Sequence, residues 1–110
     1  MISDINKKKT LSKQEIVCKR IFSQMRGLMF RKKQNLIMEF PKERRISLHN
    51  CFVFFTTDVL ILDSEKRIVE IKRNLRPFHF WSALQKGKYV IELGLPENRG
   101  YDVGDRINFS

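Results

Sequence analysis

The stretch that decides the fold is Ile46–Asp63, ISLHNCFVFFTTDVLILD. It is a long apolar block that also contains His49, Cys51 and Asp58, three residues that need a reason to lie among apolar neighbours. Burying a carboxylate beside the run Val59–Leu62 costs several kcal/mol unless a partner satisfies it. Because this run is apolar at every position, it predicts a central strand that is buried on both faces.

The composition is typical of one globular domain. Of the 110 residues, 42% are hydrophobic and 11% aromatic, which argues against disorder. Nine phenylalanines favour a β-rich interior, because large rings pack well on pleated surfaces. Residues 1–10 are polar, contain Lys7–Lys9 and lack periodicity. We therefore predict a flexible basic arm over residues 1–11 and a single domain over residues 12–110.

The segment Leu11–Met29 has the features of a helix. Ser12 and Glu15 have the spacing of a capping box. Apolar residues then recur at helical intervals, at Val17, Ile21, Met25 and Leu28. Within this segment Gln14–Cys18 could equally form the edge of a strand, and the residues alone leave both alternatives open.

The rest of the chain has the pattern of short strands separated by turns. Expected strands or extended segments are Asn35–Phe40 (closed by Pro41), Ile46–Leu48, Asp58–Leu62, Ile68–Ile71, Phe78–Trp81, Tyr89–Leu93 and a short last strand near Ile107. Expected turns are Lys42–Arg45, Asp63–Lys66, Lys86–Lys88 and the segment that begins at Val103. This pattern predicts a mainly β fold, a small antiparallel β-barrel or sandwich-like single domain with one short helix.

The sequence shows neither a signal peptide nor a membrane span. No apolar segment follows the lysines at positions 7–9, and the longest apolar runs are far shorter than the roughly 20 residues that a spanning helix needs. We therefore expect a cytoplasmic protein. Cys18 and Cys51 fit a reducing compartment and are interpreted as free thiols.

Five motifs occur along the chain in an order that identifies a family. They are Gly27–Arg31 (GLMFR), the aromatic segment Leu48–Phe55 that leads to Asp58, a second carboxylate at Asp63, the strand Tyr89–Leu93 (YVIEL) and the turn Gly104–Asp105. In this order and spacing the chain resembles the family of domain of unknown function 192, over about residues 14–108. With His49 and the following FVFF it is similar to the archaeal branch. The resemblance implies a small, mainly β, barrel-like fold, prefers a strand for Gln14–Cys18 and brings no established catalytic mechanism.

Asp58 is the strongest single candidate for a site residue. In the structural interpretation it is a buried carboxylate that pairs with an arginine or caps backbone amides. Arg31 or the neighbouring Arg26 is the natural partner, because a guanidinium can hold a carboxylate with two hydrogen bonds. In the functional alternative Asp58 is an acid in a pocket, where it contacts a ligand.

His49 and Cys51 lie two residues apart, so on a strand they would point to the same face. A soft metal could then bind them together with Cys18 or His79. The spacing matches no metal-binding signature, and a nucleophilic Cys51 with His49 as its base matches no recognised motif. We favour a packed histidine and an inert buried thiol, and we expect neither a metal nor another cofactor.

Glu92 and Asp105 are further acidic candidates. Glu92 lies in an apolar strand and Asp105 in a turn. Ion pairing with Lys88 or Arg106 and capping of the turn are the simpler interpretation, and acid–base chemistry by paired carboxylates is the alternative. The predicted ligand-binding or structural pocket comprises Arg31, His49, Asp58 and Glu92.

The positive charge is concentrated in the first half of the chain. Residues 1–50 hold 13 Lys/Arg and 4 Asp/Glu, a balance of +9, whereas residues 51–110 hold 9 and 8, a balance of +1. This asymmetry predicts one basic face. The candidate nucleic-acid-binding residues are Lys19, Arg20, Lys32, Lys33, Arg44 and Arg45. Phe78, Phe80 and Trp81 could stack on bases or lie in the core.

These features favour a non-enzymatic binding module with a basic face for an acidic partner. Nucleic acid is the most concrete partner, and an acidic protein is another. The alternative function is a small-ligand-binding protein or a hydrolytic enzyme that uses the region of His49 and Asp58. The sequence identifies neither a catalytic residue nor the oligomeric state.

Overall fold

The computed structural model describes residues 1–13, 16–18, 35–49, 56–76, 80–94 and 99–109, with the backbone alone for residues 16–18, 47–49 and 80. Every regular element in these ranges is a strand. The strands are β1 (Ile2–Asp4), β2 (Lys9–Ser12), β3 (Ile16–Cys18), β4 (Asn35–His49), β5 (Thr57–Leu62), β6 (Ile68–Leu75), β7 (Phe80–Leu93) and β8 (Ile107–Phe109). The mainly β fold predicted from the sequence is confirmed.

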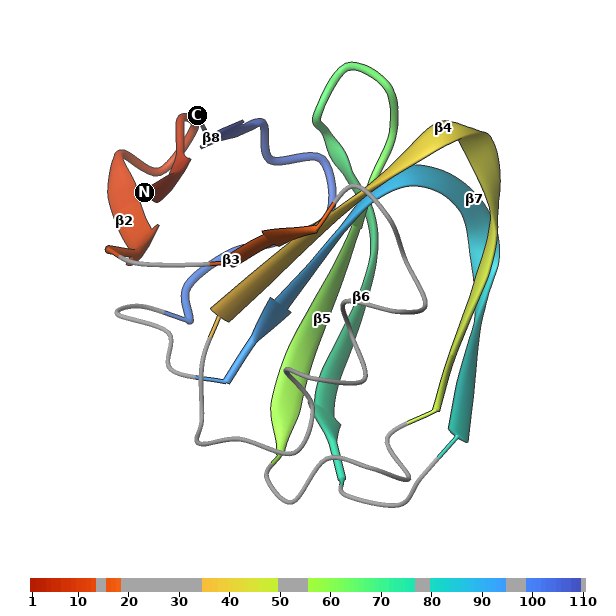
Figure 1. Ribbon diagram of the computed structural model, residues 1–110. Helices are drawn as coiled ribbons and strands as arrows, with labels where there is room; N and C mark the ends of the chain where they lie inside the picture. Colours follow the sequence, from red (N-terminus) through yellow and green to blue (C-terminus); the bar gives the residue numbers. More distant parts are fainter. Residues whose placement is uncertain (14–15, 19–34, 50–55, 77–79, 95–98, 110) are drawn as a thin grey trace.

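The strands form two sheets, which Figure 1 shows side by side. A three-stranded antiparallel sheet has the order β2-β1-β8 and carries both chain termini. A five-stranded sheet has the order β3-β4-β7-β5-β6, and its pairs are antiparallel except for the parallel pair of β3 and β4. The described strands form a sandwich-like arrangement rather than a closed barrel.

Each face of the five-stranded sheet carries its own hydrophobic cluster. On the first face, which we call the sandwich face, side chains of the large sheet pack with those of the three-stranded sheet; the cluster includes Ile2, Leu11, Ile37, Leu60, Ile91, Tyr101 and Ile107. On the second face, which we call the ribbon face, the cluster includes Leu36, Met38, Ile46, Val59, Ile61, Ala83 and Val90. The core is therefore continuous through the sheet, and β5 is buried at all six positions as predicted.

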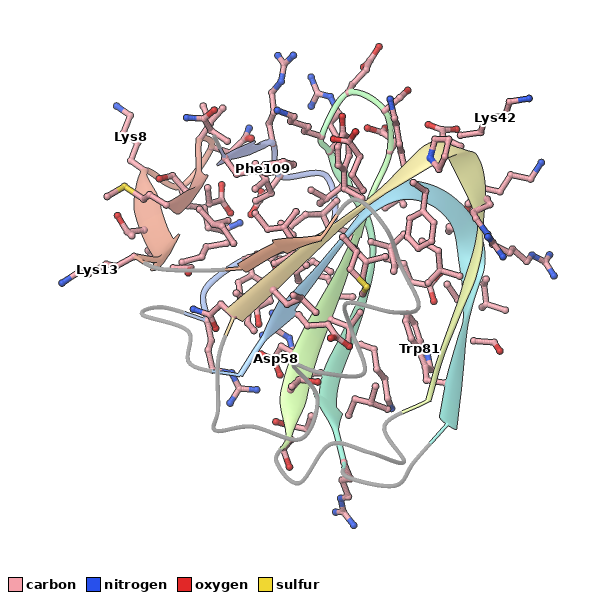
Figure 2. The ribbon with its side chains drawn as sticks, viewed as in Figure 1. Lys8, Lys13, Lys42, Asp58, Trp81 and Phe109 are labelled. Atoms are coloured by element: carbon pink, nitrogen blue, oxygen red, sulfur yellow. The ribbon has the colours of Figure 1, made fainter. Side chains whose placement is uncertain are left out.

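β4 and β7 form a long two-stranded ribbon that bends over the ribbon face (Figure 1). Ile46 and Ala83, from the outer half of this ribbon, lie in the same cluster as the inner half of the sheet. Half-buried Trp81 packs against that cluster and lies between the outer arm of the ribbon and the rest of the sheet in Figure 2. The ladder is irregular between Glu39 and Arg44, where Pro41 cannot donate a backbone hydrogen bond.

The continuous ribbon corrects three sequence-based predictions. β4 passes through Pro41 and the segment Lys42–Arg45, where the sequence predicted the end of a strand and a turn. Likewise Lys86–Lys88 lies inside β7 instead of forming a turn. A Cβ atom at Gly87 would collide with the side chain of Ile61. The glycine is therefore required by close packing between strands and not by a turn.

The predicted flexible arm is also wrong, because residues 1–11 contain β1 and most of β2. Ile2 and Leu11 are fully buried. β1 pairs with β8 at the other end of the chain, and Ile2 lies opposite Phe109. Because this pairing joins residues that are distant in sequence, no local pattern in the first residues could reveal it.

The predicted helix is absent from the described part of Leu11–Met29. Leu11 and Ser12 belong to β2, and Ile16–Cys18 forms β3, as in the alternative of a strand. The remainder of that segment, residues 19–29, lies outside the described residues.

The turns at two other predicted positions are confirmed. The Oδ1 atom of Asp63 accepts hydrogen bonds from the backbone N–H groups of Glu65 and Arg67, at 2.9 and 3.0 Å. Gly104 has a φ of 96°, which glycine adopts readily, and β8 follows it.

Candidate functional site

Asp58 lies near the start of β5, points to the sandwich face and is 3% exposed (Figure 2). Arg99 binds its carboxylate with two hydrogen bonds, from Nε to Oδ2 and from Nη2 to Oδ1, each 2.8 Å long. The hydroxyl group of Tyr101 donates to Oδ2, and the backbone N–H of Asn74 donates to Oδ1 at 3.0 Å. Both carboxylate oxygens are therefore fully engaged by groups of the same chain.

A β-bulge presents the amide of Asn74 to the carboxylate. The register of β5 and β6 shifts between Thr57 and Val59, so Arg73 and Asn74 both lie opposite Asp58. Asn74 has a φ of 55°, in the left-handed region that asparagine tolerates better than most residues. A bulge re-aims the groups that it displaces from the ladder, and here it frees one N–H to bind the acid.

Arg73 anchors the loop that carries the other two donors. Its Nη1 donates to the carbonyl oxygen of Arg99 at 3.1 Å, and its Nη2 to that of Tyr101 at 2.7 Å. Its guanidinium carbon lies 4.6 Å from the centroid of the Tyr101 ring, a cation–π contact. We call Asp58, Arg73, Asn74, Arg99 and Tyr101 the Asp58 cluster. It joins β5, β6 and the segment before β8.

The hydrogen bonds of the Asp58 cluster decide its ionisation. Burial alone would raise the pKa of Asp58, but the hydrogen bonds from Arg99, Tyr101 and the N–H of Asn74 outweigh burial and lower the pKa below its usual value of 3.8. Burial and the hydrogen bond to Asp58 raise the pKa of Tyr101. An ionised acid whose oxygens are already occupied favours the structural interpretation of Asp58.

The arginine expected beside Asp58 is present, but it comes from an unexpected part of the chain. Arg31 and Arg26 lie outside the described residues, and Arg99 provides the bidentate contact. Arg99 follows a Gly- and Pro-containing segment and lies 41 positions from Asp58. Sequence reasoning also missed Tyr101, whose type and position beside a charged loop gave no signal of its own.

Glu92 lies on the neighbouring strand and faces the opposite side of the sheet. It is opposite Leu36 of β4 and Val59 of β5, and strand alternation places its side chain with Val90 on the ribbon face. Glu92 is 6% exposed, and its Oε1 atom has no hydrogen-bond partner among the described residues. Burial raises the pKa of Glu92 to about 7.

The predicted cationic partners of the acidic residues differ from those in the structure. Within the described ranges, neither Lys88 nor Arg106 forms an ion pair with Glu92 or Asp105. Asp105 pairs instead with Lys7, whose Nζ lies 2.6 Å from its Oδ2. Lys7 belongs to the segment that the sequence analysis treated as an arm.

Asp105 also caps its turn and lies beside a second acid. Its Oδ2 accepts a hydrogen bond from the backbone N–H of Asp102 at 2.9 Å. Burial and the neighbouring carboxyl group of Asp105 raise the pKa of Asp4 to about 6, whereas the interactions of Asp105 with Asp4, Lys7 and the N–H of Asp102 outweigh its burial and lower its pKa. This cluster holds the three-stranded sheet to the turn that precedes β8.

The described members of the predicted pocket do not meet at one point, and the pocket as a whole stays a prediction. The backbone of His49 pairs with Phe80 at the start of β7, whereas Asp58 pairs with Leu93 at its end. Asp58 and Glu92 lie on adjacent strands but on opposite faces. The side chain of His49 and the whole of Arg31, Cys51 and His79 lie outside the described residues.

Five of the described basic residues lie at the bend of the β4–β7 ribbon. Arg44 pairs with Gly87 and Arg45 with Lys86 across the ladder, and Lys42 marks the bend in Figure 2. We call Lys42, Arg44, Arg45, Lys86 and Lys88 the basic bend. Residues 39–45 and 85–89 contain these five cations and two acids, Glu39 and Glu43, a balance of +3. Lys19, Arg20, Lys32 and Lys33 lie outside the described residues.

The basic bend is available to a partner. Lys42, Arg44, Arg45 and Lys86 are exposed and Lys88 is half-buried. Among the described residues, none of the five forms an ion pair with a carboxylate. The nearby carboxylate of Glu43 accepts a hydrogen bond from the backbone N–H of Ser64 at 2.9 Å.

The sequence motifs and the fold agree with a family comparison. The model of DUF192, described as "Uncharacterized ACR", matches residues 3–109. The chain belongs to this family. It is 34% identical over 94 residues to a UPF0127 protein of Thermococcus sibiricus, and this match covers 80% of the chain and 60% of that relative. It is 37% identical over 89 residues to a UPF0127 protein of Pyrococcus furiosus, with 76% of each chain covered. The family resemblance and its archaeal branch are confirmed, although the chain spans only about 60% of the Thermococcus relative.

Two solved structures share the fold of this DUF192 chain. A candidate transcription regulator from Sinorhizobium meliloti matches with a TM-score of 0.74 and 21% identity, over 86% of this chain and 79% of that one. A protein of unknown function from Novosphingobium aromaticivorans matches with a TM-score of 0.72 and 18% identity, over 86% and 74%. At these identities the likeness shows the fold alone.

The described residues contain neither a candidate metal cluster nor a candidate membrane-spanning helix. No group of three or more His, Cys, Asp or Glu side chains within them is arranged to hold a metal ion. No helix in the same part of the chain is long and apolar enough to cross a membrane.

Proposed function

We propose that this DUF192 protein is a binding module that holds nucleic acid at the basic bend. The observation that carries the proposal is the presence of five cations, four of them exposed, at one bend of a two-stranded ribbon, with a local balance of +3. Arg44 and Arg45, which the sequence analysis selected, lie at its centre. We extend the proposal to a cytoplasmic location, where nucleic acid is available to a basic protein.

The geometry of the basic bend suits a phosphate backbone. Successive residues of a strand point to opposite faces, so cations at neighbouring positions of β4 and β7 extend on both sides of the ribbon. A two-stranded β-ribbon is narrow enough to enter the major groove of duplex DNA. The guanidinium carbon of Arg44 lies 5.5 Å from the centroid of the Phe40 ring, which orients its charged group on the surface.

The aromatic residues and Asp58 contribute less to this proposal. Trp81 packs against the core cluster of the ribbon face, in accord with the interpretation of the aromatics as core residues. The side chains of Phe78 and Phe80 lie outside the described residues. A hydrolytic function based on His49 and Asp58 has less support, because the carboxylate of Asp58 is saturated by its own chain.

Salt-dependent binding tests this proposal directly. We expect the protein to bind a fluorescent, mixed-sequence duplex DNA or single-stranded RNA at about 50 mM salt and to lose most of its affinity by about 200 mM. The double variant Arg44→Ala/Arg45→Ala should bind more weakly. It should also reduce the slope of log K against log salt by about 1.4–1.8, since each lost phosphate contact accounts for roughly 0.7–0.9. Fluorescence anisotropy measures both quantities.

A matched variant removes the same charge elsewhere. Lys9 and Lys13 are exposed and lie across the molecule from the basic bend, as the positions of Lys13 and Lys42 in Figure 2 show. Lys9→Ala/Lys13→Ala should keep most of the affinity and slope of the natural sequence. Equal losses in both double variants would indicate general charge attraction and contradict the proposed surface. No binding at low salt, or capture of an acidic protein without nucleic acid, would contradict nucleic acid as the partner.

A further inference from the structure

Two buried side chains on the ribbon face each contain a polar atom that has no hydrogen-bond partner among the described residues. They are Glu92 of β7, which is 6% exposed, and Thr57 at the start of β5, which is 3% exposed. Among the described residues, neither Oε1 of Glu92 nor Oγ1 of Thr57 forms a hydrogen bond. Buried polar groups in native proteins are nearly always paired, because an unpaired one costs about 1–3 kcal/mol or more. Two such groups therefore call for a common explanation.

The strand register brings these two side chains to one place. Val59 lies opposite Glu92 in the β5–β7 ladder. Thr57 precedes Val59 by two residues, so it shares the ribbon face and is the diagonal neighbour of Glu92. Diagonal neighbours on one face of a sheet are separated by about 7 Å, a gap that one small polar group can bridge.

The surroundings of the pair are aliphatic. Leu36 lies opposite Glu92 on its other side, and Leu36, Val59 and Val90 belong to the cluster of the ribbon face. Leu75, which lies opposite Thr57, belongs to the same cluster. A few convergent polar groups within an apolar lining are the usual composition of a small-molecule site.

We propose that Glu92 and Thr57 form the polar end of a small-molecule site that takes a primary ammonium group on a short aliphatic chain. An ionised carboxylate only accepts hydrogen bonds, and an ammonium group only donates them, so the two are complementary in charge and in hydrogen bonding. The hydroxyl oxygen of Thr57 accepts a second N–H, and the aliphatic side chains contact the rest of the ligand.

Other classes of ligand fit this pair less well. A divalent metal such as Ca²⁺ takes six to eight oxygen ligands, and Glu92 and Thr57 provide far fewer. A carboxylate or phosphate would be repelled by the ionised acid. A neutral alcohol has no charge to compensate the ionised carboxylate and could pair only with the protonated form of Glu92, which would raise the pKa and not lower it.

The ionisation of Glu92 fits the proposal. Burial raises its pKa to about 7, so near neutral pH the free protein contains both the protonated and the ionised form. The described side chains that flank it on β4, β5 and β7 are Leu36, Val59, Thr57 and Val90, none of which titrates. Because an ammonium ion binds the ionised form, ligand binding must lower the pKa of Glu92.

This site is independent of the basic bend. The ionised carboxylate of Glu92 repels a polyanion, and the five cations of the basic bend repel a cationic ligand. The two proposals therefore use opposite charges and can fail separately.

The test is an NMR titration of the full chain labelled at its glutamate carboxyl carbons. With n-butylammonium chloride as the probe, we expect a saturable shift of the Glu92 signal and a decrease of its pKa by at least about one unit, a tenfold effect. Sodium butyrate and n-butanol should produce neither change. Thr57→Val should weaken butylammonium binding by roughly threefold to tenfold, the loss of one hydrogen bond.

The controls separate this site from general charge effects and from misfolding. Glu65→Gln removes an exposed acid and should leave butylammonium binding unchanged, whereas Glu92→Gln should abolish it. If Glu92→Gln fails to fold, the titration of the natural sequence still decides the question. A Glu92 signal whose chemical shift and pKa do not change with butylammonium would overturn the proposal. So would a pKa below 4.5 in the free protein, because it would show that a cation of the chain itself already pairs with the acid.

Discussion

Asp58 and Glu92 are two buried carboxyl groups one step apart in the β5–β7 ladder, and their pKa values shift in opposite directions. Asp58 on the sandwich face accepts four hydrogen bonds, and its pKa is lowered. Glu92 on the ribbon face has an unpaired oxygen among the described residues, and its pKa is raised to about 7. Both are at most 6% exposed. The comparison teaches that hydrogen-bond donors, and not burial alone, decide which acid is ionised.

The position of the hydrogen-bond donors explains why the pKa values of Asp58 and Glu92 shift in opposite directions. Asp58 faces a β-bulge at Asn74 and a loop that carries Arg99, and both present groups that no ladder uses. Glu92 lies between Leu36 and Val59 in regular ladders on both sides. Backbone groups in a regular ladder already pair with one another, so they have no N–H to offer a side chain.

Removing Asp58 should have the largest effect. In Asp58→Ala the buried hydroxyl of Tyr101 and the N–H of Asn74 lose their acceptor, and Arg99 loses its partner. We expect the free energy of unfolding to fall by about 4 kcal/mol, because several donors lose their acceptor and each unsatisfied buried group costs about 1–3 kcal/mol. Urea denaturation at pH 7 measures this change.

The control for Asp58→Ala is Glu65→Ala, which removes an exposed acid from a turn and should change stability by less than about 0.5 kcal/mol. Equal stabilities of the two variants would contradict the structural role of the Asp58 cluster.

The sequence predicted those parts of the fold that depend on local pattern. The apolar run Val59–Leu62 indicated an interior strand, and the turn at Asp63–Lys66 followed from residues whose side chains bond nearby amides. The bent ribbon was not predictable in this way. Pro41 and Gly87 are residues typical of turns, but here the one lies at an irregularity of a continuous strand and the other avoids a collision with Ile61.

In the candidate site, too, the sequence predicted the features that depend on local pattern and missed those that depend on tertiary structure. Burial of Asp58 and its need for an arginine could be inferred from its apolar neighbours. The partner Arg99 could not, because tertiary structure brings its loop back to β5 from 41 positions away. The burial of Ile2 has the same cause, since its partner strand β8 lies at the other end of the chain.

Glu92 should give the second-largest effect, as a dependence of stability on pH. Its pKa is raised from 4.5 to about 7 on folding, so the folded state binds its proton more tightly than the unfolded state. The stability from this proton is fully present below about pH 4.5 and is lost as the pH rises through 7. A shift of this size corresponds to about 3 kcal/mol.

The measurement compares urea denaturation of the natural sequence and Glu92→Gln between about pH 5 and pH 8. The natural sequence should lose up to about 3 kcal/mol relative to the variant over this range. Asp4, whose pKa is raised to about 6, changes stability in the same direction in both proteins, so its effect cancels in the difference. If the free energy of unfolding changed with pH equally in both proteins, Glu92 would not titrate in this range. Its pKa would then not be raised as this comparison with Asp58 requires.

Tyr101→Phe should give the smallest effect. It tests whether the donors around Asp58 lower its pKa, because it removes one of them. The ring stays in the core cluster and keeps its contact with Arg73, but Asp58 loses one of its four hydrogen bonds. We expect a loss of about 1–2 kcal/mol at pH 7, typical of one hydrogen bond to a charged group.

The pH dependence of Tyr101→Phe distinguishes lost packing from lost hydrogen bonding. A lowered pKa makes Asp58 contribute stability above pH 3.8, and this stability disappears as the pH falls through the folded-state pKa. Without the hydroxyl of Tyr101 the pKa of Asp58 must move up towards 3.8, so the variant should reach its acid limit at a higher pH than the natural sequence. Tyr89→Phe is the matched control, because the ring of Tyr89 packs edge-on against Phe109 and its removed hydroxyl does not bond Asp58. If both variants raised the pH of acid unfolding equally, the pKa of Asp58 would depend on the aromatic packing of this face rather than on the donors around its carboxylate.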